Sequence, residues 1–79
     1  MQTYDVIKHP KHYLLADGTE VKQHIDSIVA EMNGDTAWKS ANVIKYVARA
    51  DKKNGLEDLK KCREYVDMLI EQKEKELKA

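Results

Sequence analysis

Residues 37–62, AWKSANVIKYVARADKKNGLEDLKKC, decide the fold because two helical patterns meet in them at Asn54-Gly55. Before this pair, apolar residues recur with the period of an α-helix, which predicts a helix from about Ala37 to Lys53. Asn and Gly commonly end a helix in a left-handed conformation. The pair therefore predicts a turn, with another helix following at once.

The segments on either side carry the same period. The apolar positions of a first helix are Val21, Ile25, Ile28, Val29 and Met32. Those of the last helix, in a seam close to heptad spacing, are Leu56, Leu59, Cys62, Val66, Leu69, Ile70 and Leu77. Asn33-Gly34 is expected to end the first helix, and Asp35 or Thr36 to cap the next one.

No helix is expected in the N-terminal segment. Pro10 disfavours helical backbone before it, and Asp17-Gly18 suits the two-residue turn of a β-hairpin, although the segment is short enough to be a simple turn. We expect a mainly α fold in a single domain of residues 1–79. A short extended lead-in or β-hairpin over residues 1–21 precedes three helices over residues 22–79.

The composition excludes several classes of protein. The 79 residues carry 14 Lys and Arg against 14 Asp and Glu, which rules out a uniformly basic nucleic-acid coat. No apolar run reaches the roughly 18 residues of a membrane span, and the first residues do not resemble a signal peptide. We therefore expect a cytoplasmic protein. A chain this short buries only about 60% of its unfolded surface, so we also expect a homo-oligomer.

The neutral total hides an uneven distribution of charge. Residues 1–38 hold three lysines against six acidic residues, a net charge of −3, and residues 54–79 hold six basic against seven acidic residues, a net charge of −1. Residues 39–53 hold five basic residues and one acidic residue, a net charge of +4. The positive charge is therefore concentrated on the middle helix, and the acidic flanks make nucleic acid a weak candidate as a partner.

A helical wheel divides the middle helix into a core face and a polar stripe. The core face comprises Ala37, Ser40, Ala41, Val43, Ile44, Val47 and Ala48. The stripe comprises Trp38, Asn42, Lys45, Tyr46, Arg49 and Lys53. Cations neutralise phosphates, an Asn amide donates and accepts, and aromatic rings stack on bases, so the stripe has the composition of a nucleotide or phosphate site. The alternative is a basic outer face whose aromatic residues are covered by the N-terminal segment or a neighbouring subunit.

The sequence HPKHY at residues 9–13 is a second polar cluster. Lys11, His12 and Tyr13 could lie across the middle helix and supply a charge, a titratable donor and a ring, or the segment is an ordinary lead-in to the hairpin. Its two histidines have a spacing found in metal sites. Only His24 and scattered carboxylates could complete the ligand set, so no metal site is expected.

Asp58 stands in the first turn of the last helix, beside the basic end of the middle helix. It could pair with Arg49 or Lys53, or it could position a Mg²⁺ ion bound to phosphates. Short helical hairpins bring such ends together, so we favour the ion pair. The sequence has no P-loop and no glycine-rich dinucleotide motif, so any phosphate chemistry must use side chains on helices.

The chain resembles a small bacteriophage domain family of unknown function in HPKHY at residues 9–13, NVIKY at residues 42–46 with Arg49, Lys52-Lys53, and LEDLKK at residues 56–61 with Tyr65. Members of that family are often labelled nucleotide kinase, and the family is similar to part of the early coliphage kinase that phosphorylates dTMP and dGMP without a P-loop. The resemblance spans about residues 9–70. The recurrent polar residues of the family fall on His12, Tyr13, Asn42, Lys45, Tyr46, Arg49, Lys53, Asp58 and Lys61.

The resemblance implies a phage protein in the cytoplasm of the infected host that binds a nucleotide. It also implies phosphorylation of deoxynucleoside monophosphates with ATP and Mg²⁺. Lys45, Arg49 and Lys53 are expected to neutralise phosphates, and Lys45 and Arg49 are the expected catalytic residues. Asn42 is expected to orient the ligand, and Tyr13 or Tyr46 to stack on the base. Further substrate contacts are expected from Lys11, His12, Asp58 and Lys61. The alternative to an enzyme is a non-catalytic phage protein that sequesters a nucleotide or binds and inhibits a host protein.

Overall fold

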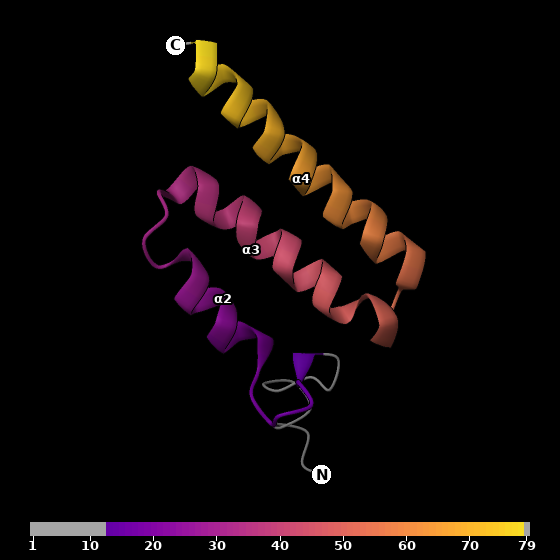
Figure 1. The fold of residues 1–79 in the computed structure, drawn as a ribbon. Coiled ribbons are helices and arrows are strands. Elements are labelled where there is room, and N and C mark those ends of the chain that lie inside the picture. The colour runs from indigo at the N-terminus through magenta and orange to yellow at the C-terminus, as the bar shows by residue number, and fades with distance from the viewer. Residues whose placement is uncertain (1–12, 79) are drawn as a thin grey trace.

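A computed structural model of the chain describes residues 13–78. These form the helices α2 (Val21–Val29), α3 (Gly34–Arg49) and α4 (Gly55–Lys78), with a 3-10 turn, η2 (Ala50–Lys52), between α3 and α4. The expected mainly α fold with three helices is confirmed. The helices lie side by side in one layer with α3 in the middle (Figure 1). Within the described residues, no helix is long and apolar enough to cross a bilayer.

The boundary between α2 and α3 differs from the expectation. α2 ends at Val29, and the side-chain oxygen of Asn33 accepts a hydrogen bond from the Thr36 N–H at 2.9 Å. Such a contact satisfies one of the free N–H groups at a helix start, so Asn33 caps α3. The expectation that Asn33-Gly34 ends the first helix and that Asp35 or Thr36 caps the next was therefore wrong.

The middle helix also ends earlier than expected. α3 stops at Arg49, and the backbone then tightens into η2 before the turn at Asn54-Gly55. Gly55 has a φ of 32°, a left-handed conformation that glycine adopts without a steric penalty, which agrees with the predicted turn. Because the α-helical period is interrupted, Lys53 leaves the stripe, and its side chain is exposed.

A turn stands where the sequence allowed a β-hairpin. Leu14 and Glu20 form one isolated antiparallel bridge, and no strand occurs within residues 13–78. Gly18 has a φ of 86° in this turn. The hydroxyl and N–H of Thr19 donate to Asp17 at 2.6 and 3.0 Å and lower the pKa of that carboxyl. The open alternative of a simple turn describes this segment better than a hairpin does.

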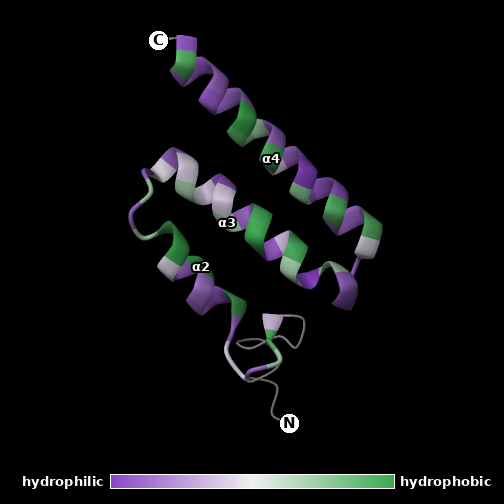
Figure 2. Ribbon diagram, viewed as in Figure 1, coloured by the Kyte–Doolittle hydropathy of each residue, from purple (hydrophilic) through white to green (hydrophobic). Residues whose placement is uncertain are grey.

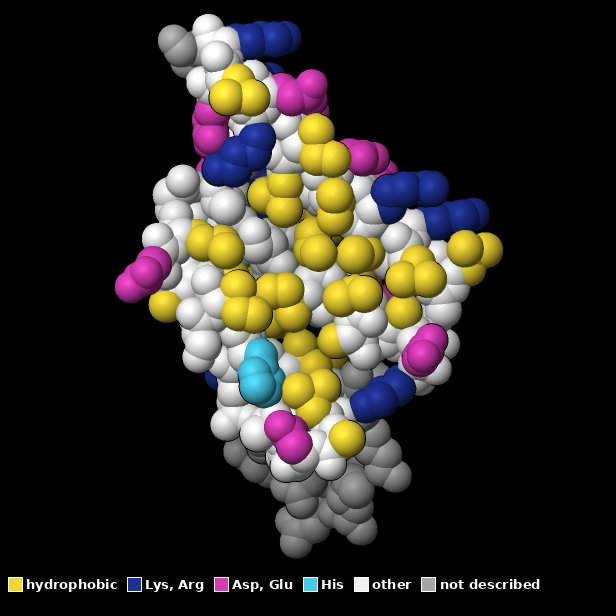
Figure 3. Space-filling view, viewed as in Figure 1, with side chains coloured by type: hydrophobic (Ala, Val, Ile, Leu, Met, Phe, Trp, Pro, Cys, Tyr) yellow, Lys and Arg dark blue, Asp and Glu magenta, His cyan; other side chains and the backbone are white. Residues whose placement is uncertain are grey.

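Little of the fold is fully buried. In residues 13–78 the buried residues are Val21, Ala50 and Asp58, and Val47 on the predicted core face of α3 is 53% exposed. Hydrophobic residues interrupt the polar sequence along each helix (Figure 2), and they gather in a band across the face seen in Figure 3. A single layer of helices leaves this face without the second layer that usually covers it. The prediction that Val47 lies in the core of the chain was therefore wrong.

Candidate functional site

An ion pair between Arg49 and Asp58 joins the end of α3 to the start of α4. The Nε and Nη2 groups of Arg49 donate to the two carboxylate oxygens at 3.2 and 3.0 Å, and the Asn54 N–H donates to the same carboxylate at 3.2 Å. The Asp58 side chain is fully buried and that of Arg49 is 11% exposed. The ion pair expected for Asp58 is confirmed, with Arg49 rather than Lys53 as its partner.

This contact shifts the acidity of both groups. The hydrogen bonds from Arg49 hold the pKa of Asp58 below its usual value, against the opposing effect of burial, and the Asn54 N–H acts in the same direction. The pKa of Arg49 is raised, chiefly by the same contact. Nη1 of Arg49 also donates to the Tyr13 hydroxyl at 3.0 Å. The guanidinium is therefore a structural bridge that keeps one N–H on each terminal nitrogen for another acceptor.

Three cations surround the ring of Tyr46. Lys45 Nζ lies 4.3 Å from the ring centroid, Arg49 Cζ lies 4.9 Å from it, and Nζ of Lys61, on α4, lies 5.7 Å from it. An aromatic ring attracts cations within about 6 Å of its centroid. Tyr46 therefore holds positive groups from two helices close to one another. We call Lys45, Tyr46, Arg49 and Lys61 the cation cluster.

The aromatic residues of the stripe pack against α4. The Tyr46 ring stacks on Tyr65 with centroids 5.9 Å apart and an interplanar angle of 16°. Trp38 meets the same Tyr65 ring edge-on, at 5.9 Å and 89°. The aromatic side chains are thus partly covered, as the alternative interpretation of the stripe required, but the cover is α4. Trp38 is still 47% exposed.

The other predicted site residues are spread around this cluster. The Asn42 amide nitrogen donates to the Trp38 carbonyl of its own helix at 2.8 Å, which leaves the side-chain oxygen of Asn42 to accept. Lys53 is exposed beyond the end of α3. Lys11 and His12 lie outside the described residues. The structure thus brings Tyr13, Arg49 and Asp58 into one network and Lys45, Tyr46 and Lys61 into an adjoining one.

A small hollow adjoins the cation cluster between the start of α2 and α3. Its volume is about 240 Å³, and it is lined by Tyr13, Glu20, Val21, Lys22, Ile25 and Lys45. Pockets that enclose a drug-sized ligand measure about 300–1,000 Å³. The hollow is therefore too small to enclose a whole ligand of that size, and Lys45 links it to the Tyr46 ring.

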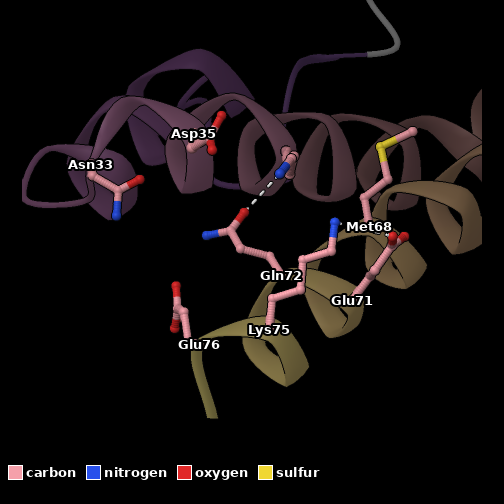
Figure 4. Close-up of a pocket in the computed structure, with 8 residues that line it drawn as sticks. Asn33, Asp35, Met68, Glu71, Gln72, Lys75 and Glu76 are labelled. Carbon is pink, nitrogen blue, oxygen red and sulfur yellow. Dashed lines mark hydrogen bonds and ion pairs between the residues drawn. The ribbon is translucent and has the colours of Figure 1, made fainter. Parts of the chain in front are cut away.

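A larger hollow, of about 670 Å³, lies between the start of α3 and the second half of α4 (Figure 4). Lys39 Nζ donates to Gln72 at 2.7 Å across it, and Lys75 pairs with Glu71 at 3.4 Å. The full lining is Asn33, Asp35, Lys39, Met68, Glu71, Gln72, Lys75 and Glu76. Its three carboxylates outnumber its two ammonium groups, so this hollow suits a phosphate less well than the cation cluster does.

The wheel of the middle helix alone did not find the contribution of α4. Lys61 entered the predicted site only through the family resemblance, and Tyr65 did not enter it. A signal exists in the sequence, because Asp58, Lys61, Tyr65 and Gln72 recur at helical spacing. Among residues 13–78, no group of three or more His, Cys, Asp or Glu side chains is placed to hold a metal ion.

Comparison with known protein families gives a match over most of the chain. The model of a family described as a protein of unknown function, DUF3310, matches residues 7–67, which is most of the chain. No curated protein matches the sequence, and no solved structure matches it.

Proposed function

Because the chain belongs to the DUF3310 family, whose function is unknown, we propose its function from the cation cluster: it is a phage protein that binds a nucleotide through its phosphate. The observation that carries the proposal is the approach of Lys45 from α3 and Lys61 from α4 to one ring, that of Tyr46. Two ammonium groups supplied by separate helices can donate to the oxygens of one phosphate from both sides. No carboxylate within residues 13–78 forms an ion pair with Lys45.

The roles of the individual residues follow from their contacts. Lys45 and Lys61 contact the phosphate, and Arg49 positions the end of α3 while offering its remaining N–H groups. The Tyr46 ring is occupied by Tyr65 and by the cations. Stacking on the base is therefore assigned to the ring of Trp38, which is 47% exposed.

Phosphoryl transfer is the catalytic form of the same proposal. Transfer from ATP with Mg²⁺ to a deoxynucleoside monophosphate needs little covalent chemistry from a protein beyond positioning and charge neutralisation. Lys45, with Arg49 behind it, would neutralise the charge on the transferred group. The competing function is sequestration of the nucleotide without turnover, or the binding and inhibition of a host protein.

Calorimetry with inorganic phosphate and a panel of deoxynucleoside mono-, di- and triphosphates tests the binding. Lys61→Ala should weaken nucleotide binding about tenfold, because one charge-assisted contact is lost. Lys75→Ala is the matched control, since Lys61 and Lys75 each pair with a glutamate one helical turn earlier at 3.4 Å, but only Lys61 approaches Tyr46. Equal effects of the two substitutions, or no binding by any nucleotide, would refute the proposal.

Turnover is tested separately by incubating the protein with ATP, Mg²⁺ and each deoxynucleoside monophosphate. Formation of the diphosphate together with ADP, and its loss in Lys45→Ala, supports the kinase. Binding of a nucleotide without a diphosphate product supports sequestration. Absence of both leaves inhibition of a host protein as the function to examine.

A further inference from the structure

The structure divides the apolar seam of α4 into two parts. Cys62 packs toward α3, where its Sγ donates to the Val43 carbonyl at 3.5 Å, and Leu69 is partly buried. Val66 is also partly buried, whereas the other large members of the seam are about half exposed or more. They are Leu56, Leu59, Ile70 and Leu77, which are 68%, 49%, 52% and 87% exposed.

The four exposed residues, together with Val66, follow a strict heptad pattern. Positions 56, 59, 63, 66, 70, 73 and 77 alternate steps of three and four residues, which are the a and d positions of a coiled coil. Five of them are Leu, Ile or Val, and the other two are Arg63 at a and Lys73 at d. The pattern continues through three heptads of an uninterrupted helix. It is therefore the pattern of a helix that packs against another helix.

We propose that a second copy of this chain covers this face, with the two α4 helices paired antiparallel about a two-fold axis. Charge decides against a parallel pair, in which each residue faces its own copy across the axis. Arg63 would then oppose the partner's Arg63, and Lys73 the partner's Lys73. In an antiparallel pair each a residue faces a d residue, and both like-charged contacts are avoided.

One antiparallel register places an apolar residue opposite every charged seam residue. In it Arg63 faces the partner's Val66, and Lys73 faces the partner's Leu56, so that each long side chain can lie along an apolar neighbour. Leu59 then faces the partner's Ile70. The register shifted by one heptad toward the C-terminus instead places Arg63 opposite the partner's Lys73, which is unfavourable.

The same register also pairs opposite charges beside the seam. Antiparallel helices bring their e positions together, and these are Lys60, Asp67 and Glu74. Lys60 lies beside the partner's Asp67, and the symmetry repeats the contact. Lys61 is at position f, on the side of α4 opposite the seam, so the pairing leaves the cation cluster open. The proposal therefore stands or fails independently of nucleotide binding.

Sedimentation equilibrium over a concentration series tests the pairing. The expected mass is twice the 9.1 kDa of the chain. Ile70→Glu places a charge in the seam and should give a monomer, with helicity kept by circular dichroism. Lys75→Glu changes an f position and should remain a dimer. A monomeric wild type, or a mass that Ile70→Glu leaves unchanged, overturns the proposal and points to a different cover for this face.

A charge exchange tests the orientation. Lys60→Asp alone or Asp67→Lys alone places like charges at two symmetric contacts, and each should weaken dimerisation about tenfold. The double exchange should restore the dissociation constant. A parallel pair keeps these positions apart, so single substitutions without effect overturn the antiparallel arrangement, as does a double variant as weak as the single ones.

Discussion

Replacement of Arg49 by Met tests whether the buried ion pair holds the corner between α3 and α4 together. Methionine keeps an unbranched apolar stem but removes the guanidinium that donates to Asp58 at 3.2 and 3.0 Å. The carboxylate would then be fully buried with the Asn54 N–H as its remaining described donor. Removal of one partner from a buried ion pair costs about 3–5 kcal/mol. Because the Asn54 contact remains, we expect Arg49→Met to lower the free energy of unfolding by about 3 kcal/mol, the lower end of that range.

That loss is large for a chain of this size. At about 0.05–0.15 kcal/mol per residue, the whole free energy of unfolding is roughly 4–12 kcal/mol. A loss of 1 kcal/mol lowers the melting temperature of a small domain by about 4–8 °C, so the variant should melt roughly 12–24 °C lower. Urea unfolding followed by circular dichroism measures the free energy. Lys75→Met, which removes only an exposed pair, should cost less than about 0.5 kcal/mol.

The pH dependence supplies a second measurement of the same ion pair. The pKa of Asp58 is lowered in the folded protein, so its contribution to stability is present above its unfolded pKa of about 3.9 and is lost as the pH falls through the lower folded value. Without Arg49, burial favours the neutral acid instead. The difference in free energy of unfolding between wild type and Arg49→Met should therefore begin to shrink above about pH 4, where the variant's carboxyl takes up a proton, and should shrink further as the pH falls toward the lowered pKa of the wild type. A loss at pH 7 under about 1 kcal/mol, or one that is constant with pH, would contradict the reasoning.

Three smaller effects follow from other contacts. Asn33→Ala removes the cap that accepts from the Thr36 N–H and should cost about 1 kcal/mol in urea unfolding, whereas an effect near zero would show that the cap does not stabilise α3. Tyr13→Phe removes the acceptor of Arg49 Nη1 and should cost about 1.5 kcal/mol; it also tests the corner if Arg49→Met does not fold. Gly18→Ala introduces a Cβ at a φ of 86° and should cost about 1 kcal/mol, although no atom lies within 4 Å of that Cβ, and an unchanged melting temperature would contradict this.

The helices were predictable where local chemistry is unambiguous. The apolar period of α3 and the turn at Asn54-Gly55 can both be recognised from a short stretch of sequence. The ion pair of Asp58 was predictable because a tight helical hairpin leaves that carboxylate few partners. The helix boundary at Asn33 was not predictable in the same way. Asn before Gly serves both as a helix end and as a helix start, and the choice depends on whether its side chain reaches a free N–H.

The site was predictable only in part because a helical wheel describes one helix at a time. The wheel of the middle helix grouped Tyr46 with Lys45 correctly as neighbours, but it could not show that α4 brings Tyr65 under the ring and Lys61 beside it. It also assigned Val47 to the core, because periodicity reports an apolar face and does not report whether a second layer covers that face. Those contacts depend on tertiary packing.

The corner at Arg49 and Asp58 has a consequence for the order of folding. The two residues are nine positions apart, whereas Tyr13 reaches Arg49 across 36 positions. Closing the shorter loop costs less chain entropy, so the α3–α4 hairpin should form in the transition state before the N-terminal turn docks on it. Kinetic φ-values should accordingly be higher for Ala50→Gly in the corner than for Tyr13→Phe, and the reverse order would show that docking comes first.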